Sequence, residues 1–357
     1  MTTVHASVGR LIAAATSLLV QAGASDATAS LVALQLIKND LDGYPSHGLQ
    51  RLPDYLADIK KGFLDPTATP RASRTGRTEL TIDAGRTFGA LVVPAITEGL
   101  REIVSEHGAG IVLLRNSHHL GRLSSIGFSA SAHASPYVLI GFCNFAGCGA
   151  RVAYPGTSSA TLCTNPLLIS IPIPGEDPFV LDMSTTTVAE GKVRAAVNAD
   201  LPIPTGWLID RDGNSVTDPT ALYADENKAT MTPLGWPSAA HKGFHLGLAA
   251  EMLVGAYAGA GNIHNPSSPG NGALFVGFQT SIGQRSGGAE NAVSIVAAAT
   301  GGARYPGSTA GTTASVEEIR RSCSGNVQIT ESLERFLDSA VNYGALSKGS
   351  SQGVRRA

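Results

Sequence analysis

The spacing of apolar residues changes at about residue 79, and this change limits the folds open to the chain. Before it, apolar residues recur at i, i+3 and i+4 and predict helices over 6–22 and 26–41. After it, short apolar runs such as Ile111–Leu114 predict buried strands, together with one long helix over 92–106. The sequence therefore predicts a helical first lobe and a mixed α/β second lobe.

The length of the chain agrees with two lobes, because 357 residues exceed the roughly 150 residues of a typical domain. Pro53 and Gly62 bound one more helix of the first lobe. In the second lobe a small-residue helix is expected over 240–259, with surface loops at 211–237 and 261–288. Further strands are expected at Leu80–Ile82, Tyr137–Cys143, Leu167–Ile173, Phe179–Asp182 and Leu274–Phe278. The final segment, 346–357, reads as a disordered tail.

Charge and cysteine content exclude several classes of function. The formal net charge is -2, so the chain has no positive field for nucleic acid or anionic lipid. Only 15% of residues are charged, against about 25% in average soluble proteins, which favours a surface shared with a second subunit. Four cysteines without C-x-x-C spacing indicate a reducing compartment. We therefore expect a cytoplasmic protein, and we read residues 10–24 as an amphipathic helix instead of a signal peptide.

The glycine-rich loops that usually hold nucleotide phosphates are absent from the sequence. Neither G-x-G-x-x-G nor G-x-x-x-x-G-K-[ST] occurs. Gly108-Ala109-Gly110 follows a predicted helix and precedes a strand, which is the reverse of the order that binds pyrophosphate. The sequence therefore lacks both the Rossmann and the P-loop fingerprints.

His47 and Arg51 form the first candidate site. One helical turn between them would place an imidazole and a guanidinium on one face. The imidazole can exchange a proton near neutral pH, and the planar guanidinium fits a carboxylate. The alternative is a histidine that caps a turn beside a solvated arginine.

Other histidines give weaker signals. His118 and His119 follow a strand at the end where α/β sheets bind ligands, although they could be ordinary loop residues. His241 and His245 have the spacing of a helical metal pair, but Lys242 stands where H-E-x-x-H has glutamate, so we predict no metal site. Lys242 at a helix start could bind an anion, or it could be a solvated residue of the first helical turn.

Together these segments resemble the malate/L-lactate dehydrogenase family, which is unrelated in sequence to the Rossmann-type lactate and malate dehydrogenases. Residues 46–55 resemble the family's "SHG-x-x-R-x-P-x-Y" segment, and residues 116–121 resemble "NS-x-H-x-G". Thr164-Asn165-Pro166 resembles "GTNP", and Leu181–Thr185 resembles "DMATS". Residues 241–244 resemble "GGHKGYG", and 304–307 resemble "LPG".

The resemblance implies a fold that composition cannot show. The expected fold is a helical N-terminal lobe plus a mixed, mostly antiparallel sheet domain that binds the dinucleotide without a Rossmann fingerprint. Residues 1–75 would form the substrate and dimer lobe, joined by C-terminal helices at about 315–345, and 76–314 would bind the dinucleotide. The family also implies a homodimer.

The resemblance further implies the reaction and its residues. NAD or NADP would exchange a hydride with C2 of a small 2-hydroxy or 2-oxo acid. His47 would donate the proton, Ser46 would orient it, and Arg51, Tyr55 and His119 would hold the substrate. The cofactor-binding residues would be Thr164, Asn165, Asp182, Met183, Ser184, His241, Lys242, Arg304, Pro306 and Gly307.

Two alternatives stay open at this stage. The same family includes ureidoglycolate dehydrogenase, diketogulonate reductase and sulfolactate dehydrogenase, and also NADPH-dependent reductases of the cyclic imino acids Δ1-piperideine-2-carboxylate and Δ1-pyrroline-2-carboxylate. Some of these reductases carry "SHH", like Ser117-His118-His119. A catalytically idle binding or scaffold protein would explain the low charge, but it would not explain why the titratable motifs occur together.

Overall fold

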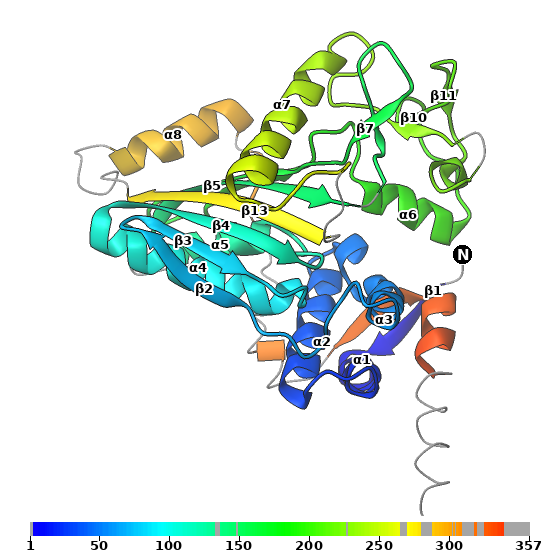
Figure 1. Ribbon diagram of the computed structural model, residues 1–357, viewed down its shortest axis with the longest axis horizontal. Coiled ribbons are helices and arrows are strands. Elements are labelled where there is room, and N and C mark those ends of the chain that lie inside the picture. Colours follow the sequence, from blue (N-terminus) through cyan, green and yellow to red (C-terminus); the bar gives the residue numbers. More distant parts are fainter. Residues whose placement is uncertain are drawn as a thin grey trace, which may run out of the picture. The chain divides into compact units, whose positions relative to one another are not determined.

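The computed structural model describes most of the chain (Figure 1). The described residues are 3–132, 136–147, 149–225, 228–264, 270–279, 288–301, 303, 305–308, 318–319 and 325–338. They form two compact units. The first unit runs to Ala68 and includes the described residues from 318 onward, and the second runs from Thr69 to Ser308.

Helices dominate the first unit, as predicted. α1 (Val8–Gln21) buries Leu11, Ala15 and Leu19 against α2 (Asp26–Leu41). Ser25 caps α2 because its hydroxyl accepts the Thr28 N–H at 3.2 Å. Two short 3-10 turns follow, η1 (Pro45–His47) and η2 (Leu49–Arg51), and then α3 (Leu52–Lys60).

A two-stranded sheet in this unit was not predicted. β1 (Thr3–Ser7) pairs antiparallel with β14 (Asn326–Thr330), so the prediction of helix throughout 315–345 is wrong at β14. Val327 and Ile329 are buried and alternate with exposed neighbours, which is the period-2 pattern of a strand. Residues 331–338 are helical. Most of the remaining segment, and the predicted tail at 346–357, lie outside the described residues.

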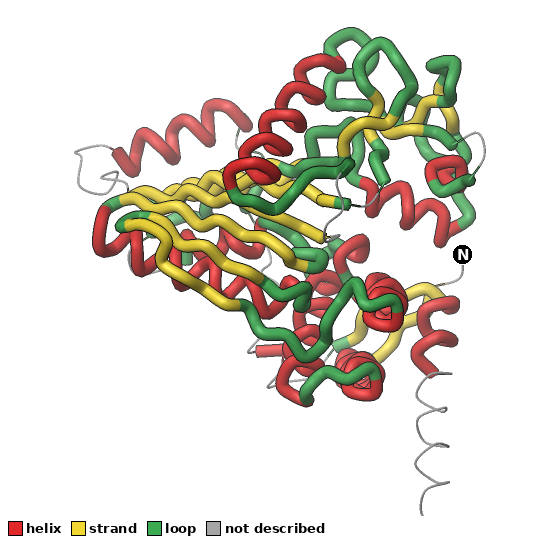
Figure 2. Tube along the Cα trace, in the orientation of Figure 1, coloured by secondary structure: helices red, strands yellow, loops and turns green. Residues whose placement is uncertain are grey.

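The second unit is built on a seven-stranded sheet in the order β2-β3-β4-β13-β5-β8-β9. Figure 2 draws the strands in yellow. Only β3 and β4 pair in parallel among these described strands, so the prediction of a mostly antiparallel sheet is confirmed. The strands are β2 (Arg71–Gly76), β3 (Glu79–Asp83), β4 (Ala109–Ser117), β5 (Tyr137–Ala146), β8 (Leu167–Ile171), β9 (Phe179–Met183) and β13 (Gly270–Gln279). The sequence-based boundary at 75/76 falls inside the β2–β3 hairpin, whereas the units meet at Ala68/Thr69.

Helices cover both faces of this sheet. α4 (Gly89–His107) and α5 (Ser124–Ser131) pack on one face, where Ile96 and Leu100 of α4 join Val112 and Phe275 in the main core. α7 (Ala240–Met252) continues into the π-helical turn η4 (Leu253–Tyr257), which packs on β5 and β13. α8 (Gly288–Thr300) is a further helix, which was not predicted from the sequence.

A second sheet of five short strands has the order β11-β10-β12-β6-β7. It carries α6 (Glu190–Ala199) and η3 (Pro219–Leu222) beside it. Its strands are β6 (Val152–Ala153), β7 (Ala160–Leu162), β10 (Leu208–Ile209), β11 (Ser215–Val216) and β12 (Thr230–Met231). The segment 211–237, expected as a loop, thus contributes two strands of two residues each and η3.

Candidate active site

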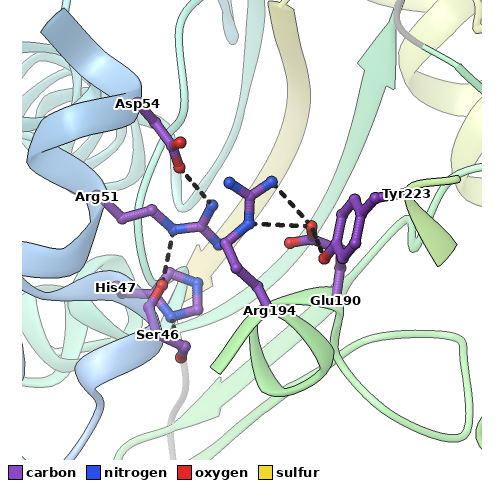
Figure 3. A network of polar contacts seen from close by, with 7 residues as sticks. All are labelled: Ser46, His47, Arg51, Asp54, Glu190, Arg194 and Tyr223. Atoms are coloured by element: carbon purple, nitrogen blue, oxygen red, sulfur yellow. Dashed lines mark hydrogen bonds and ion pairs between the residues drawn. The ribbon is translucent and has the colours of Figure 1, made fainter. Parts of the chain in front are cut away.

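The turn that carries His47 brings three predicted residues together (Figure 3). The hydroxyl of Ser46 lies 3.0 Å from Nδ1 of His47, and the Asn39 side chain donates to the His47 carbonyl at 2.9 Å. The short helix η1 starts at Pro45 without a side-chain cap. The Ser46 hydroxyl is instead bonded to the imidazole, so the rotation of the ring is restrained.

Arg51 folds back onto the same turn. Its Nε donates to the Ser46 carbonyl at 2.8 Å, and its Nη1 lies 3.5 Å from a carboxylate oxygen of Asp54 (Figure 3). The arginine side chain is only 12% exposed. The proposed proton donor and the proposed carboxylate-binding group are therefore held by one short backbone segment.

Asp40 lies directly beneath this turn and was not predicted from the sequence as a site residue. Its Oδ2 accepts the Leu49 N–H at 2.8 Å, and a Cβ added to Gly48 would stand 1.9 Å from its Oδ1. Only glycine leaves room for the carboxylate at this point. Burial raises the pKa of Asp40 to about 7, although the bond from Leu49 opposes the rise. The one hint in the sequence was an acidic residue in the last turn of a helix just before Ser46.

Tyr55 lies in the interior of the first unit. It is buried in α3, and this burial raises its pKa to about 12. The resemblance placed Tyr55 on the substrate. Its burial in the core of this unit is the expected environment of a packing residue, so a substrate contact for Tyr55 stays a prediction.

The segment around His119 is fixed by several contacts within the second unit. Asn116 takes a left-handed backbone, φ 56°, and its amide donates to both carboxylate oxygens of Asp83 at 3.1 Å. The Leu120 N–H donates to Asn271 Oδ1 at 3.2 Å. A Cβ on Gly89 would stand 2.4 Å from the His119 carbonyl, so α4 begins in close contact with this loop. His119 itself is partly exposed, as a ligand-contacting side chain must be.

The predicted cofactor segments converge on Thr185. Its N–H and its hydroxyl both donate to the Thr164 carbonyl at 3.0 Å. Its own carbonyl accepts the Leu234 N–H at 3.0 Å, and the Leu234 carbonyl accepts the Gly243 N–H at 3.2 Å. The "TNP" segment, the loop after β9 and the start of α7 are therefore connected by backbone hydrogen bonds.

The remaining cofactor candidates lie close to this network or along β9. Asp182 is exposed at the end of β9, and its Oδ2 accepts the Ser124 N–H at 2.8 Å. Met183 and Ser184 follow it and are half-buried. The Pro306 carbonyl accepts the Val180 N–H at 2.8 Å, so the turn containing Pro306 and Gly307 packs on the same strand. Arg304 lies outside the described residues.

The start of α7 presents His241 and Lys242 to solvent. The rings of His241 and His245 lie 6.1 Å apart. Within the described ranges, no group of three or more His, Cys, Asp or Glu side chains could hold a metal ion. An exposed cation at a helix start is a suitable contact for phosphate oxygens.

The Asn165 side chain contacts a helix of the second unit. Its side chain is 1% exposed, and its Nδ2 donates to Gly247 and Glu251 of α7 at 3.0 and 2.8 Å. The amide is therefore used inside the protein, between the "TNP" segment and a helix.

A polar cluster on the second unit was missed from sequence. The hydroxyl of Tyr223 donates to Glu190 at 2.6 Å, and Arg194 binds the same carboxylate oxygen at 3.1 Å (Figure 3). The guanidinium groups of Arg151 and Arg194 lie 5.4 and 5.5 Å from the centre of the Tyr223 ring. Glu190 and Arg194 lie on α6, Tyr223 follows η3 and Arg151 precedes β6, so no short motif predicts the cluster.

Comparison with known proteins identifies the family. Residues 7–321 match the model of the malate/L-lactate dehydrogenase family, and the chain belongs to this family. It is 36% identical over 242 residues to an L-lactate dehydrogenase of Cupriavidus necator, covering 68% of this chain and 67% of that protein. It is 29% identical to a Delta(1)-pyrroline-2-carboxylate/Delta(1)-piperideine-2-carboxylate reductase of Pseudomonas putida, covering 66% of each. The alignments thus span about two thirds of these relatives.

Solved structures support the same fold. The malate dehydrogenase of Entamoeba histolytica matches with a TM-score of 0.78 at 23% identity, covering 96% of this chain and 98% of that one. The delta1-piperideine-2-carboxylate reductase of Pseudomonas syringae matches with a TM-score of 0.76 at 23% identity, covering 94% and 99%. At such identities the likeness shows the architecture alone.

Proposed function

We propose that the protein is an oxidoreductase that transfers a hydride between a nicotinamide cofactor and C2 of a small 2-hydroxy or 2-oxo acid. The Ser46–His47 pair, held on the same turn as Arg51, is the observation that carries this proposal. It combines a proton-exchanging group with a carboxylate-binding group. Membership of a family of malate and lactate dehydrogenases supports the same reaction class.

His47 acts as the general acid during reduction. Ser46 engages Nδ1, so the proton passes through Nε2 to the oxygen that becomes the hydroxyl. Arg51 binds the substrate carboxylate through its guanidinium and fixes the orientation of C2. Its bond to the Ser46 carbonyl couples the position of the carboxylate to that of the imidazole.

The residues of the second unit suit a nicotinamide dinucleotide. Lys242 and His241 are exposed at the start of α7 and offer donors to phosphate oxygens. Asp182 and Ser184 offer the acceptor and hydroxyl groups that bind ribose, and Pro306 with Gly307 borders β9. When bound, the cofactor supplies the hydride. NAD and NADP are both compatible with this donor set.

A second candidate is the reduction of cyclic imino acids, which the name of the Pseudomonas putida relative favours. An iminium carbon accepts hydride without prior protonation of an oxygen, so this reaction depends less on His47. Replacement of His47 should therefore damage ketone reduction more than imine reduction.

We also propose a homodimer in the cytoplasm. The exposed side of α7 and η4 carries Met252, 59% exposed, and Tyr257, 74% exposed, and Ile295 of α8 is 68% exposed. Apolar side chains in such numbers are typical of a surface covered by a second subunit. Met252→Glu should shift the mass measured by light scattering toward the monomer, and a wild-type monomer would contradict the proposal.

The proposed location in a reducing compartment is supported by Cys143 and Cys163, which are free thiols. Among the described residues no helix has both the length and the apolar character needed to cross a bilayer.

The proposed reaction is tested by following absorbance at 340 nm with NADH and NADPH. Each cofactor is combined with pyruvate, oxaloacetate, longer 2-oxo acids and the two cyclic imines. We expect oxidation of one cofactor with at least one 2-oxo or 2-imino acid. Folded protein that oxidises neither cofactor with any of these compounds would contradict the proposal.

A further inference from the structure

Glu251 is a buried carboxylate that no predicted role uses. It lies near the end of α7 and is 7% exposed. Its Oε2 accepts the Asn165 amide at 2.8 Å, and its Oε1 accepts the Ile263 N–H at 3.1 Å. The two carboxylate oxygens therefore bind two different segments that are distant in sequence.

The contact to Asn165 fixes an unusual backbone. Asn165 has φ 29°, in the left-handed region that non-glycine residues adopt at a cost of about 1 kcal/mol or more. Its amide donates to Glu251 and to the Gly247 carbonyl, so both of its N–H bonds point at α7. The Asn165 side chain thus stabilises the left-handed backbone directly after Thr164.

The same face of α7 approaches the loop after β9. A Cβ on Gly247 would stand 2.8 Å from the Thr185 hydroxyl, and that hydroxyl donates to the Thr164 carbonyl at 3.0 Å. Glu251 lies one turn further along α7 and binds Asn165, so Glu251 and Thr185 both bind the Thr164–Pro166 segment. Directly after Met252 the helix widens into the π-helical turn Leu253–Tyr257, a feature that is often found at functional positions.

Burial of a carboxylate costs free energy unless its oxygens are well hydrogen-bonded. An apolar residue at this place would fill the volume without that cost, but it could not bind the Asn165 amide and the Ile263 N–H together. Orientation of these two segments is what a glutamate supplies here and an apolar side chain does not.

We propose that Glu251 is a positioning residue of the dinucleotide site. It holds Asn165, and through Asn165 it sets the Thr164 carbonyl and the loop Asp182–Thr185 relative to the start of α7. This inference rests on the proposed function. It reassigns Asn165 from a cofactor contact to the link between Glu251 and the residues that contact the cofactor.

The test uses Glu251→Gln in the full chain. Glutamine keeps one acceptor for Ile263 but turns an amide donor toward the Asn165 donor. The dissociation constants of NADH and NADPH are measured by nucleotide fluorescence on protein whose fold is verified by circular dichroism. We expect the dissociation constant of the cofactor to rise about tenfold, while the substrate KM at saturating cofactor changes by less than about threefold. Glu102→Gln, an exposed glutamate on α4, is the matched control and should bind as the wild type does.

A second variant covers the case in which Glu251→Gln does not fold. Asn165→Gly accepts the left-handed backbone but removes the side-chain link, and it should weaken cofactor binding in the same way. The pair Asn165→Asp with Glu251→Gln again places a donor opposite an acceptor between these two side chains, but it removes the bond from residue 165 to the Gly247 carbonyl. It should bind the cofactor more tightly than Glu251→Gln alone, a recovery that simple loss of packing would not give.

The outcomes separate the two proposals. If the wild type binds neither NADH nor NADPH, the proposed function and this inference are both wrong. If the wild type binds a cofactor, and Glu251→Gln and Asn165→Gly bind it equally well, only the positioning role of Glu251 is wrong. A lower melting temperature with unchanged cofactor affinity would also contradict that role.

Discussion

Asp40→Asn removes a carboxyl group from beneath the His47 turn while keeping an oxygen that accepts the Leu49 N–H. In the wild type that oxygen accepts the bond at 2.8 Å, and the carboxylate lies against the Cα of Gly48. Burial raises the pKa of Asp40 from 3.8 to about 7. The folded chain therefore binds this proton more tightly than the unfolded chain does.

The sign of the pH effect follows from that difference. Between about pH 4 and pH 7 the folded state keeps the proton and the unfolded state has lost it, so the free energy of unfolding falls as pH rises. Above pH 7 Asp40 is ionised in both states. The free energy of unfolding is then about 4 kcal/mol lower than it is when Asp40 is protonated in both states. Asparagine does not ionise, so the variant avoids this cost.

The assay is urea unfolding of wild type and variant at a series of pH values from 5 to 8. We expect Asp40→Asn to be the more stable protein at pH 8, by an amount that approaches about 4 kcal/mol and falls to about 1.5 kcal/mol at pH 5. Asp26→Asn removes an exposed carboxylate at the start of the same helix and serves as the control. A stability difference that is independent of pH, or a variant less stable than wild type at pH 8, would refute the reasoning.

Four substitutions separate the roles of the proposed substrate and cofactor residues. His47→Ala should lower kcat for ketone reduction by about 10²–10⁴ and abolish the fall in rate as pH rises, and an intact pH limb would identify another donor. Arg51→Ala should raise the substrate KM strongly because each charged hydrogen bond contributes roughly 1.5–3 kcal/mol. Arg51→Lys should recover only part of this, and full recovery would argue against bidentate binding. Lys242→Ala should raise the cofactor KM about tenfold, or about 1.4 kcal/mol, and a larger rise in the substrate KM would move Lys242 to the substrate side.

The sequence predicted those parts of the fold that depend on local periodicity. α1, α2 and α4 follow from apolar spacing, and β4, β5 and β9 follow from short apolar runs. Pairing between distant segments has no local signal. β1 and β14 are separated by more than 300 residues, and neither is long or apolar enough to be recognised alone.

In the candidate site, too, contacts between residues close in sequence were predicted and contacts between distant ones were not. Ser46, His47 and Arg51 are close in sequence, so a short motif predicted that they meet. Asp40 and Glu251 act through backbone N–H groups of Leu49 and Ile263, and such bonds leave no pattern in the residue types. For Asn165 the motif gave no sign of its bond to Glu251, because contact with a ligand and contact with a helix can use the same amide.

The most direct test of the proposed reaction follows the hydride itself. NADH or NADPH carrying deuterium at nicotinamide C4, in each stereochemical position in turn, is incubated with the protein and the 2-oxo or 2-imino acid that the 340 nm panel identifies. We predict that one of the two positions delivers deuterium to C2 of the product, as read by NMR and mass spectrometry. Product without deuterium at C2 from either position would contradict direct hydride transfer.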